Sequence, residues 1–170
     1  MNIFATIEEL DELCFEKVTY YSVIFESKKH NEFEDFILRH EKLTKIEEEL
    51  ADLSAWIEEI GATIGALPNY FRHEQKADAL PPPSCFLEIE YIENLRLYCM
   101  RVTKNIVFLF NGGIKTKNVD TAQECPIVKK YFDQANQLVN AIDCLIRDKE
   151  IIVNHQSHKL EFKPTLEIEI

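Results

Sequence analysis

Arg96 and Lys115 are the two residues whose types and spacing could do chemistry in this chain. Each lies beside an apolar run rich in β-branched and aromatic residues, at 95–102 and 106–110. Three polar residues separate the two runs, which is enough to reverse the chain into an antiparallel pair of strands. The sequence therefore predicts a β-hairpin with basic side chains at its open end.

The register of this hairpin decides how close the two cations come. If Val102 faces Ile106, then Arg96 faces Gly112 on the other strand. At about 3.3 Å per residue, Lys115 then lies roughly 10 Å from Arg96, at the same end of the sheet. We therefore expect a cleft with two cations on one side of a folded-back ribbon.

Such a pair suits cleavage of an RNA phosphodiester. Attack of a ribose 2′-hydroxyl on the adjacent phosphate builds negative charge on the phosphoryl oxygens, and fixed cations can stabilise this charge without a metal ion. The Arg96 guanidinium can hold two such oxygens, and donors of this kind are worth about 3 to 4 kcal/mol each. Lys115 would be a second clamp or, if partial burial favours its neutral amine, a base. Tyr98 shares the face of Arg96 and could stack on a base or donate a proton.

Further basic residues could bind RNA around this pair. Residues 62–84 contain two glycine or proline breaks and a run of three prolines, so they read as a long loop with room for one helical turn at 72–80. This loop carries Arg72, His73 and Lys76, which could reach the same end of the sheet, with His73 as a candidate acid or base. Lys117, beyond the second strand, is a further candidate for RNA binding.

Composition and charge limit the alternatives. A chain of 170 residues with 46% hydrophobic residues fits one domain with a real core. The net charge of −11 argues against a general nucleic-acid binder, because phosphate contacts need Lys and Arg. The acidity is concentrated, however: residues 1–90 carry 20 acidic and 8 basic side chains, and residues 91–170 carry 10 and 11. No apolar run is long enough to span a membrane and no basic leader precedes residue 8, so we expect a cytoplasmic protein without a membrane partner.

Metal or cofactor chemistry is not expected. The five cysteines show no Cys-x-x-Cys spacing, and they are interpreted as reduced, mostly buried thiols. His155 and His158 have a ligand-like spacing, but the pattern supplies no third ligand. The sequence has no P-loop, dinucleotide-binding glycine pattern or His-Glu-x-x-His motif.

The remaining pattern predicts an α+β fold. Residues 1–16, with a capping-box spacing from Thr6 to Glu9, predict a short helical appendage, and 18–26 predict a strand. Capping signals and apolar spacing then predict two helices, at 31–42 and at 44–61 with Gly61 as terminator, which form an antiparallel hairpin. Three more segments follow: a strand at 85–92 before the basic hairpin, a long helix from Pro126, and a β-like extension at 151–170.

The order of these elements resembles the RelE/ParE toxin superfamily, and especially its HigB-like branch, over roughly residues 20–135. Leu95-Arg96-Leu97-Tyr98 resembles the family strand with its Tyr-Arg-type pair. Residues 106–110 followed by Gly113-Ile114-Lys115-Thr116 resemble the apolar strand that ends in a Lys-Lys-Thr-like motif, and Cys125-Pro126 resembles the start of the next helix. The resemblance implies a single RelE-like domain: a small antiparallel sheet packed against a helical hairpin and a C-terminal helix.

The same resemblance implies a function and partners. It implies the toxin of a type II toxin–antitoxin system, a metal-independent endoribonuclease that cleaves messenger RNA, often on the ribosome. Its partner would be an antitoxin protein, of the helix-turn-helix type, bound to the helical hairpin or to a sheet edge. The alternative is a ParE-like or inactive relative that acts only by protein–protein binding. A third interpretation is an unrelated α+β protein in which the basic hairpin is purely structural.

Overall fold

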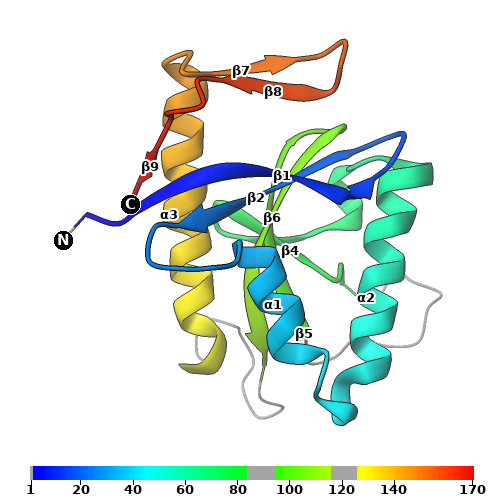
Figure 1. The fold of residues 1–170 in the computed structure, drawn as a ribbon. Coiled ribbons are helices and arrows are strands. Elements are labelled where there is room, and N and C mark those ends of the chain that lie inside the picture. Colours follow the sequence, from blue (N-terminus) through cyan, green and yellow to red (C-terminus); the bar gives the residue numbers. More distant parts are fainter. Residues whose placement is uncertain (1, 84–94, 116–125) are drawn as a thin grey trace.

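A mixed sheet of seven strands forms the centre of the molecule (Figure 1). The computed structural model describes residues 2–83, 95–115 and 126–170. The strand order is β3-β4-β5-β6-β2-β1-β9, and β2 runs parallel to β6. The α+β class is therefore confirmed, but the sheet is larger than expected and is not purely antiparallel. The strands are β1 Phe4–Cys14, β2 Thr19–Phe25, β3 Arg72–Glu74, β4 Ala77–Leu80, β5 Leu95–Thr103, β6 Ile106–Ile114 and β9 Ile168–Glu169.

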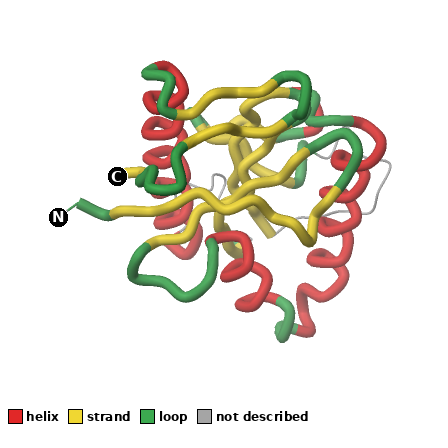
Figure 2. The backbone as a smooth tube through the Cα atoms, turned by 45° about the horizontal axis from the view of Figure 1, so that its top comes forward, coloured by secondary structure: helices red, strands yellow, loops and turns green. Residues whose placement is uncertain are grey.

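Helices cover both faces of this sheet (Figures 1 and 2). On one face, α1 (Glu32–His40) and α2 (Glu47–Glu59) run in opposite directions and bury Phe36, Leu53 and Trp56 against β5 and β6. On the other face, α3 (Pro126–Arg147) buries a stripe that includes Phe132 and Leu138. Each face thus has its own hydrophobic core, as a sheet packed between two helical layers requires.

Helix α1 begins where the sequence predicts, whereas α2 begins at Glu47 with no side-chain cap, although a capping box at Thr44 was expected. The Asn31 side chain accepts a hydrogen bond of 2.8 Å from the Glu34 N–H, which caps α1. A 3₁₀ turn, Thr44–Ile46, leads into α2. Gly61 does not end α2, because the helix continues into a π-helical turn, Ile60–Ile64, and the chain leaves it at Gly65 with φ 84°. The terminator is Gly65, since a positive φ favours glycine.

The predicted helical appendage at residues 1–16 is wrong, because Phe4–Cys14 form strand β1. It pairs with β2 from Ala5 to Glu9, and Phe4 and Ala5 also pair with β9. Ala5 and Leu10 are buried on opposite faces of the sheet. The capping signal at Thr6 is local, and pairing with the β-rich strand that follows overrides it.

The predicted loop at residues 62–84 is also partly wrong, because it contains the hairpin of β3 and β4. The turn between them is Gln75-Lys76, where Gln75 has a φ of 62°. β4 pairs antiparallel with β5. The predicted strand at 85–92 lies outside the residues that the structure describes.

The β5–β6 hairpin is in a different register from the expected one. Thr103 pairs with Ile106 across a two-residue turn, and Arg96 lies opposite Gly113 instead of Gly112. A bulge in β6 accompanies this register: Cys99 pairs with Leu109, whereas Leu97 pairs with Gly112. One extra residue therefore stands in β6 between Leu109 and Gly112.

The C-terminal residues form a hairpin and an edge strand. β7 (Ile151–Asn154) and β8 (Lys159–Phe162) pair antiparallel, as the β-like extension at 151–170 predicts. Leu160 N–H donates to the Tyr21 hydroxyl at 2.9 Å and so ties this hairpin to the sheet. β9 then joins the main sheet beside β1, so this part of the chain is integrated into the domain. None of the helices in the described parts is both long and apolar enough to span a membrane.

Because the β5 backbone lies close to Gly112 at this bulge, we predict that no side chain fits at this position. A Cβ at this position would lie 1.8 Å from the Arg96 carbonyl oxygen, which is backbone and cannot move away alone. Gly112→Ala should lower the free energy of unfolding by more than about 2 kcal/mol, measured by denaturant titration. Gly61→Ala is the matched control: its Cβ would meet side-chain atoms of the partly exposed Phe15, which can shift as a whole, so its loss should be smaller. Equal losses in both variants would contradict this account of β6.

Candidate functional site

Strands β3, β5 and β6 and the residue after β6 carry four charged residues on one face of the sheet, which we call the cationic corner: Arg72, Glu74, Arg96 and Lys115. Alternation along the strands determines the face. Arg72 lies level with Ala79 and Tyr98, whose side chains belong to the core under α3. Arg96 is two residues from Tyr98, and its partner Gly113 is two residues from Lys115. The structure thus brings Arg72, Arg96 and Lys115 to the same face of the sheet.

Electrostatic coupling among these four residues agrees with the strand geometry. Burial raises the pKa of Glu74 above its ordinary value, although Arg72, Arg96 and Lys115 each lower it. Burial and the neighbouring Arg72 lower the pKa of Arg96, while Glu74 acts in the opposite direction. A carboxylate therefore lies within the field of three cations.

The corner has an exposed rim and a buried floor. Arg72, Glu74 and Lys115 are partly exposed, whereas Arg96 is only 7% exposed and donates a hydrogen bond of 2.9 Å from Nη1 to the Leu95 carbonyl oxygen. The Nε of Arg72 is buried and has no hydrogen-bond partner in the described part of the chain. Buried donors are normally satisfied, so this guanidinium is suited to receive an anionic acceptor.

Tyr98 belongs to the hydrophobic core. It is fully buried, and its ring packs edge-on against Phe132 of α3 with the centroids 5.9 Å apart. A ring in this position offers no face to an RNA base. Its side chain is on the same face of the sheet as Arg96 but is fully buried, so the proton-donor role stays a prediction.

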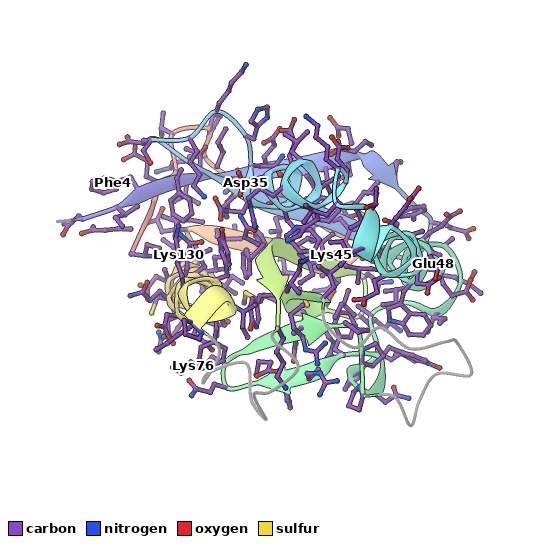
Figure 3. The ribbon with its side chains drawn as sticks, turned by 90° about the horizontal axis from the view of Figure 1, so that it is seen from below. Phe4, Asp35, Lys45, Glu48, Lys76 and Lys130 are labelled. Atoms are coloured by element: carbon purple, nitrogen blue, oxygen red, sulfur yellow. The ribbon has the colours of Figure 1, made fainter. Side chains whose placement is uncertain are left out.

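His73 and Lys76 are not brought to the corner. His73 lies between Arg72 and Glu74 and therefore points to the opposite face, where its Nδ1 is 2.7 Å from Asp78 Oδ1. Lys76 lies in the β3–β4 turn, beside α3 (Figure 3), and both its N–H and its ammonium group donate to asparagines of α3. Lys117 lies outside the described residues.

Glu74 is the site residue that sequence reasoning missed. It could have been found from the pattern Arg72-x-Glu74, because two residues two apart on a strand share a face. Because residues 62–84 were interpreted as a loop, the two-residue period of a strand was not expected there. In a strand, the same three residues place Arg72 and Glu74 beside Arg96 and His73 away from it.

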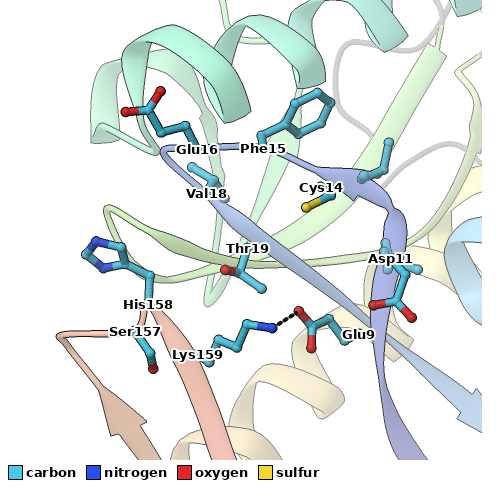
Figure 4. Close-up of a pocket in the computed structure, with 12 residues that line it drawn as sticks. Glu9, Asp11, Cys14, Phe15, Glu16, Val18, Thr19, Ser157, His158 and Lys159 are labelled. Atoms are coloured by element: carbon cyan, nitrogen blue, oxygen red, sulfur yellow. Dashed lines mark ion pairs between the residues drawn. The ribbon is translucent and has the colours of Figure 1, made fainter.

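A separate pocket lies between the turn after β1 and the β7–β8 turn (Figure 4). Its volume is about 250 Å³, and an ion pair of 2.8 Å between Lys159 Nζ and Glu9 Oε1 lies within it. None of the cationic-corner residues lines it. Among the residues that the structure describes, no three His, Cys, Asp or Glu side chains are grouped as a metal site. The cationic corner is therefore the candidate functional site.

No family model, curated protein or solved structure matches this chain. The assignment of a function thus depends on the residues and geometry of the corner.

The raised pKa of Glu74 predicts a pH-dependent gain in stability on removing its charge. A group whose pKa is higher in the folded state than in the unfolded state stabilises the fold fully only at low pH, and this contribution is lost as pH rises through the folded pKa. Glu74→Gln should therefore be more stable relative to wild type at pH 7.5 than at a pH below about 4.3, the ordinary glutamate value. Denaturant titrations of both proteins at the two pH values measure this difference. A difference of zero, or of the opposite sign, would mean that burial does not dominate at Glu74.

Proposed function

We propose that this protein is a metal-independent endoribonuclease that cleaves messenger RNA, and that the cationic corner is its active site. The observation that carries the proposal is the position of Glu74, a partly buried carboxylate in the field of Arg72, Arg96 and Lys115. Cleavage through the 2′-hydroxyl needs a base, an acid and fixed positive charge, and these four residues can supply all three.

In the proposed reaction, Glu74 accepts the proton of the ribose 2′-hydroxyl. The 2′-oxygen attacks the adjacent phosphorus, and the bond from phosphorus to the 5′-oxygen breaks. The products are a 2′,3′-cyclic phosphate and a 5′-hydroxyl, with the leaving oxygen protonated by the Lys115 ammonium. Arg72 and Arg96 hold the phosphoryl oxygens that become more negative in the transition state. The raised pKa of Glu74 makes its carboxylate a stronger base than that of an ordinary glutamate.

The proposal includes the partners that the family resemblance implies. As a RelE-like toxin of a type II system, the protein would act in the cytoplasm and would be kept silent by an antitoxin of the helix-turn-helix type. The ribosome would hold the messenger RNA against the corner and supply further contacts. This division of labour suits a chain whose net charge is −11 but which places Arg72, Arg96 and Lys115 around one carboxylate.

One observation favours a second candidate, a RelE-fold or ParE-like protein that acts only by binding another protein. Arg96 is 7% exposed and Tyr98 is fully buried, so two of the three catalytic residues expected from the sequence have little access to a substrate. In this second candidate the corner is structural, and its charges stabilise the end of the sheet. Growth arrest would then occur with intact RNA, or would not occur.

The nuclease proposal predicts both cleavage and its loss in corner variants. The purified protein should cut a single-stranded oligoribonucleotide in excess chelator and leave 2′,3′-cyclic phosphate ends. Glu74→Gln and Lys115→Met should each lower kcat by about 100-fold, the cost of removing one preorganised group. Induced expression of the wild type should arrest growth, and expression of either variant should not.

Lys104→Met is the matched control, because Lys104 is an exposed lysine at the opposite end of the same hairpin. It should cleave like the wild type. A substrate with a 2′-deoxyribose at the cleavage position should resist all of the proteins. Cleavage that persists in both corner variants, or that cuts the deoxy substrate, would refute the assignment of the active site.

A further inference from the structure

Arg39 joins three elements near the cationic corner. It lies in the last turn of α1, and its Nε donates to Asp35 Oδ2 at 3.0 Å. Its Nη2 donates to the Asn111 side chain and, at 2.9 Å, to the Gly112 carbonyl oxygen, both in β6. Its guanidinium lies 4.7 Å from the ring centroid of Tyr131 in α3. One side chain of α1 thus reaches the backbone of β6 and the helix on the opposite face.

Asn111 connects the same region to buried carboxylates. It is 1% exposed, and its amide N–H groups donate to Glu32 at 3.0 Å and to Asp35 at 2.8 Å. Its amide oxygen accepts from the Gly112 N–H at 2.8 Å. Hydrogen bonds from Asn111 and Arg39 lower the pKa of Asp35 although burial opposes this. Glu32 is fully buried and is paired with Lys28 at 2.5 Å.

These contacts hold the bulge of β6. Before the bulge, Phe108 and Phe110 face the core under α3, and Leu109 faces the core under α1 and α2. In a regular strand, Lys115 would share the face of Leu109. The extra residue reverses the alternation, so that Gly112 pairs with Leu97 and Lys115 points to the face of Arg96. Both backbone polar groups of Gly112 are bonded to this network: its N–H donates to the Asn111 side chain and its carbonyl oxygen accepts from Arg39.

We propose that Arg39 is a positioning residue for the cationic corner, because it holds the bulge that turns Lys115 onto the face of Arg96. Its role as an aid to catalysis rests on the proposed nuclease function, but its effect on the geometry does not. Apolar side chains of similar shape would carry a smaller desolvation penalty than these buried charges. The buried charges are therefore better explained by their role in fixing one backbone conformation of β6. Loss of the Arg39 contacts would let β6 return to regular alternation and carry Lys115 away from Glu74.

The experiment compares Arg39→Met with Lys28→Met and follows the titration of the Glu74 carboxyl carbon by NMR. Lys115 lowers the pKa of Glu74 in the folded protein, so Lys115→Met should raise it. Arg39→Met should give at least half of that rise, and adding Lys115→Met to Arg39→Met should then change little. Lys28→Met also removes a cation from the buried carboxylates, but Lys28 has no bond to β6, so the titration of Glu74 should stay as in wild type.

Kinetics provide the second measurement. Arg39→Met should lower kcat for the oligoribonucleotide by about tenfold or more with a much smaller change in KM, as misplacement of a reacting group does. Lys28→Met should not lower kcat selectively relative to KM. Arg39→Lys keeps the charge beside Asp35, but its single amine cannot reproduce all of the guanidinium contacts, so it should be intermediate in both measurements.

A folded Arg39→Met that shows the wild-type titration of Glu74 would overturn the proposal. If that variant does not fold, the same result in Arg39→Lys overturns it, and an intermediate titration supports it. An effect of Lys28→Met on Glu74 equal to that of Arg39→Met would also overturn it, because general loss of the network would then be the cause. A wild-type protein that cuts no RNA would refute the nuclease function alone, since the NMR titration still measures the position of Lys115.

Discussion

One extra residue in β6 determines which side of the sheet the end of this strand faces. The period of a strand is two, so a single insertion exchanges the two faces for every residue that follows. Here the insertion falls between Leu109 and Gly112, and the residues beyond it are the ones that lie beside Arg96. The order of the charged residues along the chain is therefore not sufficient to form the cationic corner. The corner also requires a backbone irregularity that is held in place.

The residues that hold this irregularity are unusual for the interior of a small domain. Glu32 and Asn111 are buried, and together with Asp35, Arg39 and Lys28 they form a continuous network between α1 and β6. Every hydrogen bond in such a network offsets a desolvation penalty, and a half-satisfied network would be worse than an apolar core. The network is well satisfied, with each Asn111 group bonded. The network lies beside the bulge, so its desolvation cost is offset by fixing the backbone geometry of β6.

The sequence was a good guide where local signals agree with tertiary pairing. Asn31 caps α1 as its spacing indicates, Pro126 begins α3, and the β-rich runs on both sides of Lys104 form a hairpin. The sequence was a poor guide where pairing with a remote segment determines the secondary structure. The segment 1–16 carries a helix signal, but Phe4–Cys14 form a strand, because β2 and β9 offer backbone hydrogen-bonding groups on either side.

The candidate site was predictable only in part for the same reason. Arg96 and Lys115 could be placed at one end of the hairpin because an antiparallel pair brings its two ends together. The sequence could not predict the bulge that places Arg96 and Lys115 on one face. This bulge depends on contacts with Arg39, which is more than seventy residues away along the chain. Glu74 was missed because three residues of edge strand have too little periodicity to be distinguished from a loop.

The charge balance of the corner links the buried carboxylate to the chemistry proposed for it. Arg72 and Arg96 repel each other, and the negative charge of an ionised Glu74 offsets this repulsion. In the proposed reaction, Glu74 takes up a proton from the ribose hydroxyl, so the corner would lose one negative charge. At the same moment the phosphoryl oxygens gain negative charge within the same field of cations. The net charge of the corner with its substrate thus changes little between ground state and transition state, while the cations come to face the phosphate instead of the carboxylate. Stabilisation of this kind needs little reorganisation, which is the property that makes fixed charges effective in catalysis.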